Sequence, residues 1–220
     1  MEEAERELRI DGEALIASAQ RYLLWPREQA VLIADLHLGK GEAFRRAGIS
    51  VPRGGTAQDL ARLSGVLTRT AARELMILGD FLHHSGSGGD WRDDWRLWRE
   101  QHADVRVRVI AGNHDRQLEA VAPDMDIDLI GAELLRAPFR LRHDPVERDA
   151  HVIAGHLHPR VGVPGLPGKW HAFWLRPKFT VLPAYSDFTG GYYPSPRQGG
   201  EFLACADGHL LAMPASALRR

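Results

Sequence analysis

Four short apolar runs along the chain each end abruptly in a polar residue of the Asp, Asn or His type. The runs cover residues 30–34, 75–78, 105–111 and 152–154. Uninterrupted apolar runs of this length, bounded by turn residues, are typical of strands that are buried on both faces of a sheet. The pattern therefore predicts four buried strands, each with a polar side chain just beyond its carboxyl end.

Helical periodicity appears in the segments between these runs. Three helices are predicted, over residues 56–72, 90–102 and 116–121. Thr56 is the predicted N-cap of the first, and Pro123 stops the third. The second carries Trp91, Trp95 and Trp98 at positions i, i+4 and i+7, which favours one buried face. Alternating strands and helices predict an α/β fold in which polar residues gather at the carboxyl ends of the strands.

The last third of the chain has a different pattern. Strand-like stretches at 173–182, 200–206 and 209–213 are separated by clusters of Pro and Gly. This predicts a second sheet packed on the first, and so a layered β-sandwich flanked by helices. A chain of 220 residues, 44% of them hydrophobic, has enough material for one well-buried core. We therefore expect a single domain spanning residues 1–220.

Charge and cysteine content narrow the function classes. The chain has 28 Lys and Arg against 29 Asp and Glu, so any polyanionic ligand must be held by local charges. The single Cys205 leaves no internal disulfide and fits a reducing compartment. The acidic, polar start is not expected to be a signal peptide, and no apolar stretch approaches the roughly 20 residues of a membrane helix. These features predict a cytoplasmic protein without a membrane partner.

Chemistry is concentrated in four motifs at the ends of the apolar runs. They read D-L-H at 35–37, G-D-F-L-H at 79–83, G-N-H-D at 112–115 and G-H-L-H at 155–158. A single histidine at a strand end is usually a structural residue, but four such motifs in order point to a metal site. Carboxylate, amide and imidazole donors suit Mn²⁺, Fe²⁺ or Zn²⁺. The central Asp80 is placed to bridge two ions about 3.5 to 4 Å apart. The Gly before Asp80, Asn113 and His156 is expected to permit a sharp turn.

Together with a separate His143, this series resembles the calcineurin-like metallophosphoesterase superfamily. The resemblance spans residues 35–158 and implies a dinuclear metal site at the carboxyl ends of the strands. It implies that one metal is held by Asp35, His37 and His158, the other by Asn113, His143 and His156, with Asp80 between them.

The same resemblance gives the remaining motif residues their expected roles. His114 would contact the scissile phosphate or the leaving oxygen, with Asp115 orienting its imidazole. His143 is expected to be the solitary histidine ligand because a loop separates it from the last apolar run. His151, eight residues later, is the alternative.

Two differences between this chain and motifs found in branches of the superfamily make those branches less suitable. The second motif lacks the G-D-x-V-D-R-G continuation of protein Ser/Thr phosphatases, and His114 stands where lipid A precursor hydrolases carry Arg. Residues 24–26, 34–40, 48–54 and 79–83 are instead similar to the small bacterial ligase-associated metallophosphoesterases. That resemblance implies a manganese-dependent endonuclease on single-stranded DNA, with Fe²⁺, Zn²⁺ or Co²⁺ as other metal candidates. It also implies a DNA ligase and a helicase of a repair cluster as partners.

Several residues are candidates for binding the substrate. Lys40 and Arg53, near the first motif, are placed to meet the flanking phosphates of a strand, although a solvated charged face is an equal alternative. His83 suits either phosphate binding or support of the metal ligands. Tyr192 and Tyr193 are candidates for stacking bases. The three tryptophans are further candidates, but their helical spacing favours core packing.

Two other functions fit the same sequence. One is hydrolysis of cyclic or small nucleotide diesters, and the other is a scaffold subunit of a repair complex. The presence of every expected ligand together with His114 favours an enzyme over the scaffold.

Overall fold

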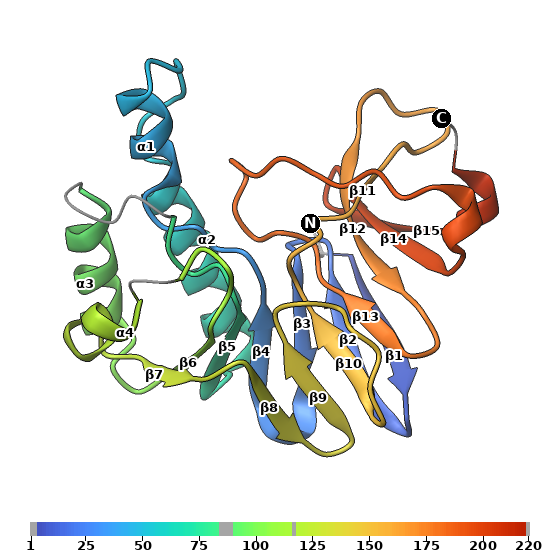
Figure 1. Cartoon of the computed structure of the whole chain (residues 1–220), viewed down its shortest axis with the longest axis horizontal. Coiled ribbons are helices and arrows are strands. Elements are labelled where there is room, and N and C mark those ends of the chain that lie inside the picture. The colour runs from blue at the N-terminus through green and yellow to red at the C-terminus, as the bar shows by residue number, and fades with distance from the viewer. Residues whose placement is uncertain (1–3, 84–89, 116–117, 219–220) are drawn as a thin grey trace.

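Two mixed β-sheets form the centre of the molecule (Figure 1). The computed structural model describes residues 4–83, 90–115 and 118–218. The first sheet has the strand order β1-β2-β3-β4-β5-β6-β7, in which β1 to β4 are antiparallel and β4 to β7 are parallel. Its strands are β1 (Glu5–Ile10), β2 (Glu13–Ser18), β3 (Tyr22–Trp25), β4 (Ala30–Ile33), β5 (Glu74–Leu78), β6 (Arg106–Ile110) and β7 (Asp128–Ile130).

The second sheet has the order β15-β14-β12-β13-β10-β9-β8, with β11 paired to β12. Within it, β10 is parallel to both β9 and β13, and the other neighbours are antiparallel. Its strands are β8 (Glu133–Arg136), β9 (Phe139–Arg142), β10 (His151–Ala154), β11 (Arg160–Val161), β12 (Trp170–Leu175), β13 (Phe179–Val181), β14 (Glu201–Ala206) and β15 (His209–Pro214).

The helices gather on one side of the first sheet, away from the second sheet (Figure 1). They are α1 (Lys40–Arg46), α2 (Gly55–Thr70), α3 (Trp91–Gln101) and α4 (Leu118–Val121). The chain also has short 3-10 turns, η1 (Pro26–Glu28), η2 (Ala122–Met125), η3 (Pro196–Gln198) and η4 (Ala215–Ala217), of which η4 packs against the second sheet. In the part of the chain that the structure describes, no helix is long and apolar enough to cross a membrane.

The apolar residues pack in three layers. One layer lies between α2, α3 and the first sheet and includes Leu63 and Trp95. The central layer fills the space between the two sheets and includes Trp25 and Phe173. The third covers the outer face of the second sheet and includes Phe202. The sheets and helices are therefore held in a fixed stack, with the strand ends at its edge.

The predicted α/β fold with a second sheet is confirmed, and the four apolar runs are β4, β5, β6 and β10. Two boundaries differ. Gly54, with φ 82°, caps α2 in place of the predicted Thr56. The run 173–182 is two antiparallel strands, β12 and β13, because the chain reverses around Pro177. The predicted start of the third helix at Arg116 lies outside the described residues.

Candidate metal centre

Three parallel strands of the first sheet deliver one donor each to the same edge. Asp35 follows β4, Asp80 follows β5 and Asn113 follows β6. The loops after β4 and β5 are joined by backbone hydrogen bonds from Asp35 N to Gly79 O, at 3.2 Å, and from His37 N to Asp80 O, at 2.9 Å. The D-L-H and G-D motifs thus hold one another in place.

The second sheet supplies the histidines. His143 follows β9, and His156 and His158 follow β10. Gly155 N donates to His143 O at 3.0 Å, and His156 N donates to Asp35 Oδ2 at 3.1 Å. The last bond crosses from one sheet to the other, so the candidate centre lies where the two sheets meet.

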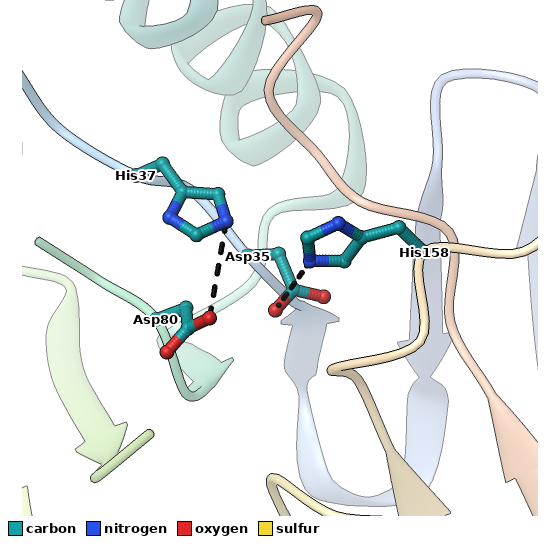
Figure 2. Close-up of side chains that lie close together, drawn as sticks. All are labelled: Asp35, His37, Asp80 and His158. Carbon is teal, nitrogen blue, oxygen red and sulfur yellow. Dashed lines mark ion pairs between the residues drawn. The ribbon is translucent and has the colours of Figure 1, made fainter. Parts of the chain in front are cut away.

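The side chains form two groups that share one carboxylate. Donor atoms of Asp35, His37, Asp80 and His158 all lie within 4.8 Å of one another, as do those of Asp80, His143 and His156. In Figure 2 the rings of the first group face the two carboxylates, with His158 Nε2 3.2 Å from Asp35 Oδ1 and His37 Nε2 3.9 Å from Asp80 Oδ2. Asp80 occupies the central position that the sequence predicted.

His37 fits a metal ligand better than a structural histidine. It is buried, and neither ring nitrogen has a hydrogen-bond partner among the described residues. Burial, followed by the charge of Lys40, lowers its pKa far below the ordinary value, so the ring is neutral. Buried polar atoms are nearly always satisfied. A divalent cation between His37 and the neighbouring carboxylates would satisfy the ring nitrogen that faces them.

His143 presents a lone pair to the second group. Its Nδ1 donates to Leu78 O at 3.0 Å, which leaves Nε2 as the acceptor. That atom lies 2.9 Å from Asn113 Oδ1, 3.0 Å from His156 Nδ1 and 3.5 Å from Asp80 Oδ1. Such crowding of acceptors is what a bound cation would relieve. The alternative, His151, sits on β10 and contacts Thr180 Oγ1 at 3.0 Å, outside both groups.

The backbone at the candidate ligands is unusual. Asp35, His37, Asp80, His156 and His158 all have φ between 48° and 71°, in the left-handed region. Asp and His enter this region more readily than most residues, but at some energetic cost. Conformations of this kind cluster at functional sites, where the surrounding structure holds them.

The glycines of the motifs serve mainly close packing. A Cβ on Gly79 would lie 2.1 Å from His143 Nδ1, one on Gly112 2.3 Å from Asp80 N, and one on Gly155 2.6 Å from Ala34 Cβ. Only Gly79 also has a positive φ, 83°. The predicted turn requirement therefore applies to Gly79, whereas Gly112 and Gly155 let neighbouring motif loops touch.

The structure places Asp115 differently from the prediction that it orients His114. Its Oδ2 accepts hydrogen bonds from Gly112 N and Phe81 N, at 2.9 and 3.2 Å, and its Oδ1 accepts one from Leu82 N at 2.9 Å. Burial raises its pKa, although these three bonds oppose the shift. The carboxylate accepts hydrogen bonds from three backbone N–H groups, so Asp115 links the loop after β6 to the loop after β5.

His114 lies at the open side of the centre. Its side chain is 39% exposed, and Nε2 is 3.9 Å from Asp80 Oδ2. Its backbone N donates to Asp80 Oδ1 at 3.0 Å, which fixes the residue beside the shared carboxylate. This position is within reach of a substrate that approaches from solvent.

The substrate-binding candidates lie at different distances from the centre. Lys40 begins α1, and burial lowers its pKa while the charges of Asp35 and Asp80 oppose this. The His83 ring centroid is 6.1 Å from that of His37 and 6.0 Å from that of His114. Arg53 is exposed in the segment between α1 and α2.

Of the aromatic residues predicted to stack bases, some are buried in the structure and others are exposed. Trp91, Trp95 and Trp98 are buried in the core, which rules out the base-stacking alternative for them. Tyr192 and Tyr193 are exposed on a loop beside the H-L-H motif.

One neighbour of the centre was not predicted from the sequence. Asp144 Oδ1 lies 3.5 Å from His156 Nε2, the ring nitrogen opposite the one that faces His143. A carboxylate in this position steadies a histidine ligand and increases its basicity. The only signal in the sequence is that Asp144 directly follows His143.

Comparisons with known proteins place the chain in a family. The family model for the calcineurin-like phosphoesterases matches residues 29–140. No curated protein sequence matches the chain. Among solved structures, the Pseudomonas putida nuclease MPE is 29% identical, with 95% of this chain and 100% of that chain covered and a TM-score of 0.84. A protein of unknown function from Aquifex aeolicus is 19% identical, with coverages of 59% and 78% and a TM-score of 0.41. The chain thus belongs to the calcineurin-like phosphoesterase family and is a metal-dependent phosphoesterase.

Proposed function

We propose that the protein is a manganese-dependent phosphodiesterase that cuts single-stranded DNA by two-metal hydrolysis, with residues 1–220 acting as one domain. The observation that carries the proposal is the sharing of Asp80 between two groups of converging donors. The proposed ligands are Asp35, His37 and His158 for one ion, Asn113, His143 and His156 for the other, and Asp80 for both.

The chemistry follows from what surrounds these ligands. Two divalent ions held by these residues would supply Lewis acidity and would make a bound water acidic enough to act as a nucleophile near neutral pH. The chain's own part is to hold the diester in line with that nucleophile. His114, in its protonated form, donates a proton to the leaving oxygen, which therefore departs as an alcohol. Its exposed ring beside Asp80 supports this role.

A strand of DNA is favoured over an isolated small ester by the surroundings of the centre. Lys40 and Arg53 lie on the α1 side, and His83 lies between that side and the centre, where flanking phosphates of a strand would pass. The similarity in fold to the Pseudomonas putida nuclease over nearly the whole chain supports a nucleic-acid substrate. The proposed setting is DNA repair with a ligase and a helicase as partners, as the sequence resemblance implies.

The test compares substrates in one metal series. Metal-stripped protein is reloaded with Mn²⁺, Fe²⁺, Zn²⁺ or Co²⁺ and offered single-stranded circular DNA, duplex DNA and a chromogenic phosphodiester. We expect the single-stranded circle to be cut fastest with Mn²⁺ and all activity to be lost in Asp80→Ala. Cleavage of the small ester with the circle left intact would refute the nuclease and favour small nucleotide diesters. No turnover of any substrate would favour the scaffold.

A further inference from the structure

A pocket that includes Arg160 opens two residues beyond the proposed ligand His158. The chain leaves this histidine through Pro159 into β11, and the loop at 190–194 runs beside it. Tyr192 N donates to His158 O at 3.1 Å, and Arg160 N donates to Tyr192 O at 2.9 Å. A pocket of about 600 Å³ lies between these segments and the chain end near η4. In Figure 1 this region lies across the molecule from α1. We name it the Arg160 pocket.

The Arg160 pocket is lined by positively charged side chains and by apolar ones. The charged and aromatic residues are Arg160, Lys169, Arg197 and Tyr193, and the apolar ones include Val161, Pro194, Pro196 and Leu218. No Asp or Glu is among the described residues that line it. Most arginines of the described chain are ion-paired, whereas these three cations form no ion pair with any described residue. Their charge is therefore available to an anion.

The Arg160 side chain is held in position beside an exposed aromatic ring. Arg160 Nη2 donates to Lys169 O at 2.8 Å, and its stem lies so close to Gly191 that a Cβ there would be 2.3 Å from Arg160 Cδ. The Tyr193 side chain is exposed, with the residue 58% accessible, and Lys169 Nζ lies 5.9 Å from its ring centroid. A fixed guanidinium beside an exposed aromatic face is suited to a phosphate and the base next to it.

We propose that the Arg160 pocket binds a nucleotide of the substrate strand next to the scissile phosphate. The base stacks on Tyr193 over the apolar side chains, and the adjoining phosphate meets Arg160, Lys169 and Arg197. The inference rests on the proposed function. A strand held at the metals would continue within reach of Arg160, because Arg160 is two residues after the proposed ligand His158. Stacking and phosphate contacts carry little sequence information, so binding at this pocket is tolerant of base identity.

The test separates strand binding from chemistry at the metals. Binding of a fluorescently labelled oligothymidylate is followed by anisotropy in EDTA, and hydrolysis of the chromogenic diester is followed with Mn²⁺. Tyr193→Ala is expected to weaken oligonucleotide binding about 5- to 100-fold, whereas its diester activity falls far less. Tyr193→Phe retains the ring and is expected to bind like the parent. Arg197→Ala is expected to reduce the slope of log affinity against log salt by about 1.

Arg96→Ala, on the outer face of α3, is the matched control and should leave both readouts unchanged. Parent-like oligonucleotide binding in both Tyr193→Ala and Arg197→Ala would overturn the inference, and the proposed function would stand if the parent still cuts the DNA circle. A parent protein that neither binds nor cuts DNA would overturn both. Weakened binding in Tyr193→Phe equal to that in Tyr193→Ala would also count against stacking.

Discussion

His114 differs from the four histidines among the proposed ligands in that its ring belongs to neither donor group, and its side chain is 39% exposed. The ring lies beside the shared carboxylate, where a leaving oxygen would be released. A group in that position can donate a proton to the leaving oxygen. Its contribution to the rate is larger for a more basic leaving group.

Replacing His114 by Ala should therefore slow cleavage of DNA about 10²- to 10⁴-fold and slow a nitrophenyl diester much less. Metal content, measured on the same preparations, should not change. His209→Ala, an exposed histidine on β15, is the control. Full activity of His114→Ala on DNA, with both metals present, would exclude the proton-donor role.

At the residue scale, the motifs predicted the Asp and His side chains that the structure brings together, but not every contact around them. Asp35, His37 and Asp80 could be predicted because each follows an apolar run in a motif with specific spacing. The contacts of Asp115 could not be predicted, since they depend on three backbone N–H groups that only folding brings together. The charges of the Arg160 pocket come from three separate segments and form no motif.

At the element scale, one side chain of α3 packs against the segment that carries the proposed ligand His37. Trp91, at its first turn, lies so close to Gly39 that a Cβ on this glycine would be 2.8 Å from the indole. Gly39 is two residues after His37, and Lys40 N donates to His37 O at 3.1 Å. The helix therefore supports the segment that carries a proposed ligand.

Two tryptophan substitutions test this support. Trp91→Phe and Trp98→Phe both remove buried ring atoms and should each cost about 1 to 3 kcal/mol of stability. Only Trp91→Phe should also weaken Mn²⁺ binding, by several-fold in calorimetric titration, because Trp98 instead packs against Trp95 and His102. Equal Mn²⁺ affinities in the two variants would show that α3 does not position the loop.

Burial accounts for part of which elements the sequence predicted. The strands β4 and β5 are buried along nearly their whole length and give continuous apolar runs. In β1, Leu8 is the only buried residue, and β8 contains none, so neither produces such a run. The short α1 also has no buried residue and thus no apolar stripe. Weak burial explains why these elements were missed, but it does not explain β2 and β3, which are largely buried and were not predicted either.

At the scale of the whole molecule, stability should depend on pH through His171, a half-buried histidine that is not among the proposed ligands. Burial, followed by the charges of Arg21 and Arg160, lowers the pKa of His171 to about 3. In the unfolded chain this histidine has an ordinary pKa near 6.5. Between that pH and about 3 it is therefore protonated in the unfolded chain but neutral in the folded protein. Stability is therefore lost as the pH falls from about 6.5 toward 3.

Urea unfolding of EDTA-treated protein between pH 6.5 and 4.5 provides the measurement. His171→Gln should lose less stability over this range than the parent, by about 1 to 2 kcal/mol. The exposed His209→Gln should behave like the parent. Identical pH slopes for the parent and His171→Gln would show that His171 does not carry the effect.

The left-handed backbone at five proposed ligands affects how mutagenesis of this centre is interpreted. An alanine at Asp35 or His158 removes a donor and also places a residue that resists positive φ where the chain requires it. Part of the measured loss then reports conformation and not coordination. Glycine accepts this backbone at no steric cost. The difference between the alanine and glycine variants at one position therefore measures the conformational contribution, and the glycine variant alone isolates the missing donor more cleanly.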